Sequence, residues 1–169
     1  MTTQDPSTHD EVDRIVAAWR RERPDLDVAP LGVLSRVTRL ARHLDRARRA
    51  AFAQHDLETW DFDVLSALRR AGAPYQLSPG QLVTQTLVTS GTMTNRIDRL
   101  AARGLVVRHR DPADRRGVLV RLTDEGLERV DAALADLLDS ERDLLADLSS
   151  EEQESLSGLL RRLVAPFDG

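Results

Sequence analysis

The stretch "TSGTMTNRIDRLAARGLVVRHRDPADRRGVLVRLT", residues 89–123, decides the fold. Met93, Ile97 and Leu100 recur at helical spacing. Gly104 follows them and suits the left-handed backbone that closes a helix. Beyond it, two short runs, "LVVRH" and "VLVRL", flank the polar turn "RDPADRRG". The stretch therefore predicts a helix from Ser90 to about 103, followed by a two-stranded hairpin.

The same stretch carries a positive charge that the rest of the chain cancels. Residues 90–121 contain eight arginines and three acids, residues 122–169 contain four arginines and 13 acids, and the whole chain has a net charge of −4. A basic block on an acidic body indicates an anionic partner that binds at one place. A solvated arginine-rich surface is the alternative, and the charge alone leaves both open.

Further helices are predicted on both sides. "SPGQLVTQT" begins with Ser78 as a helix cap and completes a helix–turn–helix with residues 90–103. Helices are also predicted over residues 10–23, 31–55 and 60–71, with "GAPYQL" as a loop. A long helix is expected over residues 123–148, capped by Thr123. "SSEEQ" restarts a helix, with Ser150 and Gln153 fitting a capping box.

The predicted fold is mainly α with a small β-hairpin wing, that is, a winged helix-turn-helix. Residues 1–9 are expected to be disordered, 10–55 to form N-terminal helices for dimerisation, 56–122 the winged helix-turn-helix domain, and 123–169 C-terminal dimerisation helices. Apolar residues in the terminal helices follow heptad-like spacing. This predicts an obligate homodimer through these helices, with ordinary packing within one chain as the alternative.

Several classes of function are excluded by composition. The 169 residues include no cysteine and no apolar run long enough to cross a membrane, so we expect a cytoplasmic protein. The four histidines have no metal-ligand spacing, and no phosphate-binding glycine loop or nucleophile motif occurs. We therefore expect no metal, no cofactor and no enzymatic activity.

The outward face of the predicted recognition helix suits DNA. At about 100° per residue, Thr92, Asn95 and Arg99 point away from the apolar stripe. A helix of this kind enters the major groove, and arginines at a wing tip can reach a minor groove. The predicted DNA-contacting residues are Ser90, Thr92, Thr94, Asn95, Arg99, Arg115 and Arg116. A protein-interaction module that has lost DNA binding is the competing interpretation.

The motif "LVTSGTMTNRIDRLAARGLVVRHRDPADRRGVLVRLTDEG" resembles the winged-helix core of the multiple-antibiotic-resistance regulator (MarR) family. The resemblance covers about residues 30–163. It implies a homodimeric bacterial repressor that binds a palindromic operator in double-stranded DNA. It also implies release from that operator by a small, usually anionic or aromatic ligand.

An additional N-terminal helix is similar to that of the urate-responsive (PecS-like) branch of this family. The resemblance implies a ligand pocket to which residues 10–55 contribute, with a ligand site made by Trp19, Asp63, Arg96 and Arg108, and residues 56–122 as the DNA-binding domain. Independently, Arg96 falls on the flank of its helix, where a buried charge needs an anionic partner. We expect Asp63 to be that partner until an anionic ligand competes for it.

Each of these residues has a structural alternative. Trp19 could anchor its helix in the core, Asp63 and Arg96 could form a permanent pair, and Arg108 could contact phosphate. Urate is the effector that the branch implies. Citrate, aconitate and phenolic acids are the alternatives that the residues leave open.

Overall fold

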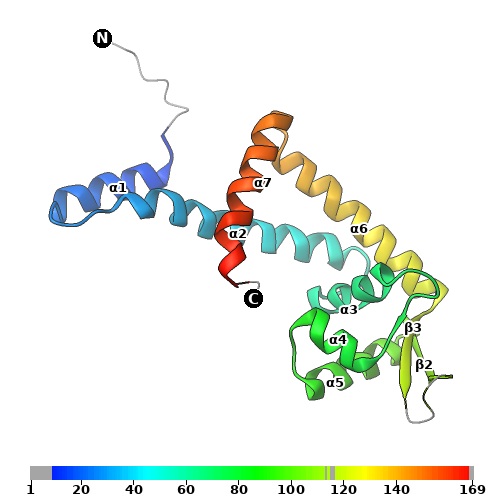
Figure 1. Ribbon diagram of the computed structural model, residues 1–169. Helices are drawn as coiled ribbons and strands as arrows, with labels where there is room; N and C mark the ends of the chain where they lie inside the picture. Colours follow the sequence, from blue (N-terminus) through cyan, green and yellow to red (C-terminus); the bar gives the residue numbers. More distant parts are fainter. Residues whose placement is uncertain (1–8, 113, 115–116, 168–169) are drawn as a thin grey trace. The chain divides into compact units, whose positions relative to one another are not determined.

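The computed structural model describes residues 9–112, 114 and 117–167 (Figure 1). The chain divides into two compact units, Met1–Ala47 and Arg48–Gly169, and each is described by itself. The segment expected to be disordered lies almost wholly outside the described residues. Helix α2 (Ala29–Ala53) begins in the first unit and ends in the second.

The first unit is organised around α1 (Glu11–Glu22) and the start of α2. Asp10 caps α1 by accepting the N–H groups of Val12 and Asp13. Val12 and Val16 are buried with Val28 in a small apolar cluster. Arg36 of α2 pairs with Asp10 and Asp13, both at 2.9 Å. This unit is a helical pair held by a short apolar contact and an ion-pair cluster.

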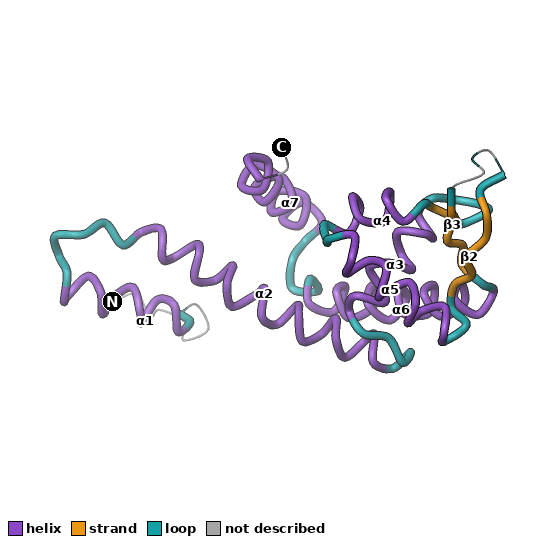
Figure 2. Tube along the Cα trace, turned by 90° about the horizontal axis from the view of Figure 1, so that it is seen from below, coloured by secondary structure: helices purple, strands orange, loops and turns teal. Residues whose placement is uncertain are grey.

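The second unit is the winged helix-turn-helix. Its further elements are α3 (Thr59–Arg70), β1 (Gln76–Leu77), α4 (Pro79–Thr86), α5 (Ser90–Ala102), β2 (Val106–Arg110), β3 (Val118–Leu122), α6 (Asp124–Leu144), α7 (Ser150–Val164) and the 3-10 turn η2 (Ala165–Phe167). The antiparallel sheet has the order β1-β3-β2. Figure 2 shows β2 and β3 at one edge of the group formed by α3, α4 and α5.

The helix-turn-helix follows from its sequence as predicted. Ser78 caps α4, and its hydroxyl accepts the N–H of Gln81 at 3.3 Å. Met93, Ile97 and Leu100 are fully buried and fasten α5 to the core. Gly104 ends α5 with φ +73°, which confirms its role as the left-handed residue after the helix.

Three local predictions were wrong. The loop "GAPYQL" contains strand β1, where Leu77 is buried opposite Val120 of β3. Helix α6 ends at Leu144 and not at residue 148. The capping box of α7 uses Ser149 and Glu152, because the helix begins one residue earlier than its pattern suggested. Gln153 instead donates to the carbonyls of Leu145 and Leu148, closing the turn before α7.

Within the described ranges, none of the helices is long and apolar enough to cross a membrane. The same residues include no group of three or more His, Cys, Asp or Glu side chains that could hold a metal ion.

Candidate nucleic-acid interface and effector site

Helix α5 presents a polar face to solvent on the side opposite its buried stripe. The exposed residues include the predicted DNA-contacting set on this helix, which comprises Ser90, Thr92, Thr94, Asn95 and Arg99. Thr89 caps the helix, and its hydroxyl lies 2.9 Å from that of Thr92. The hydroxyl of Thr94 donates to the carbonyl of Ser90 at 3.1 Å. The predicted wing residues Arg115 and Arg116 lie outside the described residues.

Trp60 of α3 lies against this face of α5. The Cζ atom of Arg99 is 4.6 Å from the centroid of the Trp60 ring, and that of Arg96 is 5.6 Å away. These are cation–π distances. A shallow hollow of about 220 Å³ is lined by Trp60, Thr92, Asn95, Arg96 and Arg99. The ring thus groups two arginines of the recognition helix beside its exposed polar residues.

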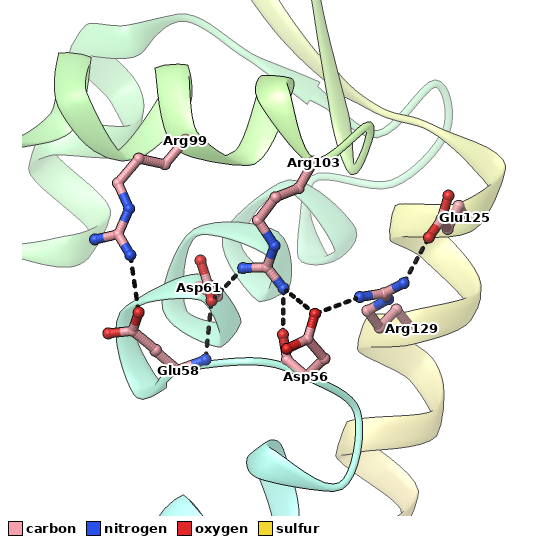
Figure 3. Close-up of polar contacts among 7 residues, drawn as sticks. All are labelled: Asp56, Glu58, Asp61, Arg99, Arg103, Glu125 and Arg129. Carbon is pink, nitrogen blue, oxygen red and sulfur yellow. Dashed lines mark hydrogen bonds and ion pairs between the residues drawn. The ribbon is translucent and has the colours of Figure 1, made fainter.

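A row of ion pairs joins α5 to the segment before α3 and to α6 (Figure 3). Arg99 pairs with Glu58 at 2.9 Å. Arg103, one helical turn further on, pairs with Asp61 at 2.7 Å and with Asp56 at 3.2 Å. Arg129 of α6 also reaches Asp56, at 3.4 Å. The C-terminal end of the recognition helix is therefore tied by charge to α3 and the segment before it, and α6 reaches the same Asp56.

Asp61 is the buried member of this row. It is the one polar or charged residue in the described part of the chain that is classed as buried, with 0% of its surface exposed. Its Oδ2 atom accepts the guanidinium of Arg103 and the backbone N–H of Glu58, at 2.7 and 2.9 Å. A buried carboxylate needs such partners because an uncompensated charge is very costly in the interior. The contact fixes α5 against the start of α3.

Asp63 lines a different hollow. That hollow measures about 260 Å³ and is lined by Arg48, Phe62, Asp63, Ser66, Arg70, Gln85, Thr86 and Leu87. Burial raises the pKa of Asp63 above its ordinary value of 3.8. The charges of Arg48, Arg96 and Arg70, in that order, offset only part of this effect. The hollow combines a half-buried carboxyl with flanking guanidinium groups, a composition suited to a small polar anion.

The expected pair between Asp63 and Arg96 is not formed. No ion pair within 4 Å includes Asp63 among the described residues, and Arg96 faces the Trp60 ring instead. The aromatic face supplies Arg96 with a partner that the helical pattern did not reveal. Arg96 still lowers the pKa of Asp63 through its charge, but less than Arg48 does.

Arg108 of β2 is occupied by α5. Its Nη1 atom lies 2.6 Å from Asp98 Oδ1, and its Nη2 donates to the carbonyl of Thr94 at 3.3 Å. These contacts tie the first wing strand to the recognition helix. Trp19 lies in the first unit, where its side chain is 48% exposed and outside the apolar cluster of α1.

Comparison with known proteins identifies the relatives of this chain. Residues 55–117 match the model of the MarR family. The chain is 41% identical over 153 residues to the HTH-type transcriptional regulator PecS of Dickeya dadantii, covering 90% of this chain and 92% of PecS. The chain belongs to the MarR family.

Other members of the MarR family extend the comparison. The HTH-type transcriptional repressor NicR of Pseudomonas putida is 32% identical, with 82% of this chain and 89% of NicR covered. A solved structure of a mutant MarR from Escherichia coli with operator DNA has a TM-score of 0.67 and 29% identity, covering 81% of this chain and 95% of that one. The similarity to PecS supports the PecS-like branch, and these relatives are transcriptional regulators, not enzymes.

Sequence reasoning missed several residues of this MarR-family site. Glu58, Trp60 and Arg103 contact or flank the recognition helix, and Arg48 and Arg70 flank Asp63. One available signal was the spacing of Arg96, Arg99 and Arg103, the last at the C-cap of α5, because residues three or four apart share a helix face. Which acids they meet depends on the packing of α3 against α5, which the pattern does not contain.

Proposed function

We propose that this MarR-family chain binds a palindromic operator in double-stranded DNA as a homodimer and acts as a repressor. The observation that carries the proposal is the exposed polar face of α5, opposite its fully buried stripe. Thr92, Asn95 and Arg99 on that face are types that contact bases and phosphates. E. coli MarR, solved with operator DNA, supports the same use of this fold.

The proposed domains follow the sequence division. Residues 56–122 bind DNA, whereas residues 10–55 and 123–169 hold the dimer together and residues 10–55 also contribute to the ligand pocket. Exposed apolar side chains support this assignment: those of α2 include Val33, Val37 and Leu40, and those of α7 include Leu159, Leu160 and Leu163. A second copy of this chain is the proposed occupant of these faces.

DNA binding is tested by replacing Arg99 with Ala. The target is a labelled duplex that the unmodified protein selects from a random-sequence library. We expect the variant to bind this duplex more weakly. The slope of log affinity against log salt should become shallower by about 0.9, because one phosphate contact is lost. Arg142→Ala is the control, because Arg142 is an equally charged, exposed residue of α6 paired with Asp139. Unchanged binding by Arg99→Ala would contradict the proposed contact. DNA affinity of the unmodified protein that does not depend on salt would favour a protein-interaction module.

We further propose that a small anionic ligand releases the operator, with urate favoured by the PecS-like resemblance. Citrate, aconitate and phenolic acids are the alternatives. The proposed ligand-binding residues are Trp19, Asp63, Arg96 and Arg108. The hollow beside Asp63 supports an anion because Arg48 and Arg70 line it. Bordetella bronchiseptica BpsR, 32% identical with a TM-score of 0.57, is a relative whose DNA binding is regulated by 6-hydroxynicotinic acid.

The effector is tested by titrating the protein with urate, citrate and salicylate while following tryptophan fluorescence. The reporters are Trp19 and Trp60. We expect saturable quenching by urate that is lost in Trp19→Phe and kept in Trp60→Phe. A ligand response that survives Trp19→Phe, with only thermal stability reduced, would assign Trp19 a structural role instead.

A further inference from the structure

Arg99, the proposed DNA contact nearest the C-terminal end of α5, is already engaged within the chain. Its Nη2 atom donates to Glu58 Oε1 at 2.9 Å, and its guanidinium lies over the Trp60 ring. Figure 3 shows Arg99 extending from the recognition helix toward the carboxylate of Glu58. The arginine that is the proposed phosphate contact is thus already paired with a carboxylate of the same chain.

Glu58 is held in place by its surroundings. It is the extended residue that precedes α3, and its backbone N–H donates to buried Asp61. Its second carboxylate oxygen, Oε2, accepts the indole N–H of Trp60 at 2.8 Å. The hydrogen bond from Trp60 lowers the pKa of Glu58, and Arg99 lowers it further. A charged carboxylate is therefore maintained beside the recognition helix at neutral pH.

This pair contributes little to folding. The side chains of Arg99 and Glu58 are 55% and 59% exposed, and ion pairs with such exposure add little or nothing to stability. Arg103 is different, because its partner Asp61 is fully buried and cannot be exchanged for a DNA phosphate. The two arginines one turn apart have separate roles: Arg103 anchors α5, and Arg99 has an exchangeable partner.

We propose that Glu58 sets the DNA affinity of this chain by competing with a DNA phosphate for Arg99, while Trp60 holds both side chains in position. The inference rests on the proposed function, since it assumes that α5 meets DNA. A phosphate that takes Arg99 must displace the Glu58 carboxylate or lie beside it, and like charges at that separation repel. Glu58 therefore weakens DNA binding, and it does so through its ion pair with Arg99.

The test measures DNA affinity of Glu58→Gln at several salt concentrations, with the full-length protein and the labelled duplex selected by the unmodified chain. We expect affinity to rise by up to about fivefold, the upper end of the range for an exposed ion pair. The salt slope should steepen by up to about 0.9, the contribution of one phosphate contact. Glu58→Ser should raise affinity in the same way, because it also removes the carboxylate and serine is a preferred residue at the position before a helix.

Two controls separate this effect from net charge and from altered folding. Glu125→Gln makes the same charge change at a glutamate that is 57% exposed and pairs with Arg129 on α6, and it should leave affinity nearly unchanged. In an Arg99→Ala background, Glu58→Gln should lose its effect. Circular dichroism of each variant checks that the fold is kept.

The outcomes separate the inference from the function on which it rests. Equal or weaker binding by both Glu58 variants would overturn the inference while the unmodified protein still binds DNA. A gain that persists without Arg99, or that Glu125→Gln reproduces, would also overturn it. Failure of the unmodified protein to select or bind any duplex would overturn the proposed function, and the inference with it.

Discussion

Asp61 and Asp63 are two residues apart in α3 and have contrasting environments. Asp61 is fully buried and bonded to Arg103, whereas Asp63 is half-buried without an ion pair among the described residues. Helix positions two apart face different directions, so the two carboxyl groups meet different neighbours. The sequence did not predict which would be buried, because that depends on which neighbour covers each face.

Removing the partner of Asp61 should destabilise the protein. Arg103→Ala leaves a buried carboxylate without its guanidinium, a change that costs about 3 kcal/mol when one side of a buried pair is lost. The measurement is urea unfolding followed by circular dichroism. Arg142→Ala breaks an exposed pair with Asp139 and should have no measurable effect. Equal stability of the two variants would contradict the anchoring role of Arg103.

Removing the charge of Asp63 should stabilise the protein at neutral pH. Because its folded-state pKa is raised, the folded protein binds the proton more tightly than the unfolded chain. The ionised carboxyl therefore costs stability, and the cost grows as pH rises through the ordinary value of 3.8 toward the raised value. Asp63→Asn should raise Tm at pH 7, and its advantage should shrink as pH falls through the raised pKa toward the ordinary value. A lower Tm at pH 7 would contradict this.

At the scale of elements, the start of α6 is fitted closely to the segment before β2. A Cβ atom added to Gly126 would lie 2.0 Å from the carbonyl oxygen of Leu105. Thr123 reinforces the contact: its N–H donates to that same carbonyl, and its hydroxyl donates to the carbonyl of Gly104 at 2.7 Å. The position of α6 is thereby linked to the end of the recognition helix.

Gly126→Ala should disturb this junction. The added methyl group meets backbone, which cannot move aside as a side chain would. We therefore expect the free energy of unfolding to fall by about 1–3 kcal/mol, the usual cost of overpacking. Gly158→Ala in α7 is the matched control, because a Cβ there meets nothing within 4 Å. It should stabilise its helix by about 0.5–1 kcal/mol. Thermal unfolding of both variants compares them, and a tolerated Gly126→Ala would refute the close fit.

Elements with strong local signals were predictable. The helix pair around Ser78 and Gly104 appeared where caps and apolar spacing placed it, because those signals act within a few residues. Strand β1 was missed because it has two residues and exists only through pairing with β3. Its signal lies in residues about 45 positions away along the chain, at Val120 and Arg121.

At the scale of the whole molecule, α2 and α7 carry exposed apolar side chains that the proposed dimer would bury. Leu163 of α7 is 51% exposed, and Val37 of α2 is 40% exposed. Large exposed apolar patches usually mark an interface. A second copy of this chain is the proposed partner of these faces.

Leu163→Glu should weaken that association. A carboxylate in an apolar contact loses its hydration without gaining a partner, so the dimer should dissociate at protein concentrations where the unmodified chain is dimeric. Sedimentation velocity measures this. Leu87→Glu is the control, since Leu87 is 92% exposed in the turn between α4 and α5, away from α7 along the chain. A Leu163→Glu protein that remains dimeric would exclude this face from the interface.

The sequence by itself determined the fold class, the family and the outward face of the recognition helix. Caps, turns and apolar periodicity are local, and a helix buries its apolar stripe wherever it packs. Met93, Ile97 and Leu100 therefore predicted which side of α5 is exposed without knowledge of the neighbouring helix. The basic charge of residues 90–121 likewise indicated an anionic partner.

Only the tertiary structure decided which charges meet. The guanidinium groups of Arg96, Arg99 and Arg103 are alike in the sequence, yet one faces Trp60, one is shared between Trp60 and Glu58, and one reaches buried Asp61. Ion pairs form between side chains brought within a few ångströms of each other, and here those side chains lie about 40 residues apart along the chain. The physical reason is that pairing depends on how α3 packs against α5, and no local sequence pattern encodes that packing.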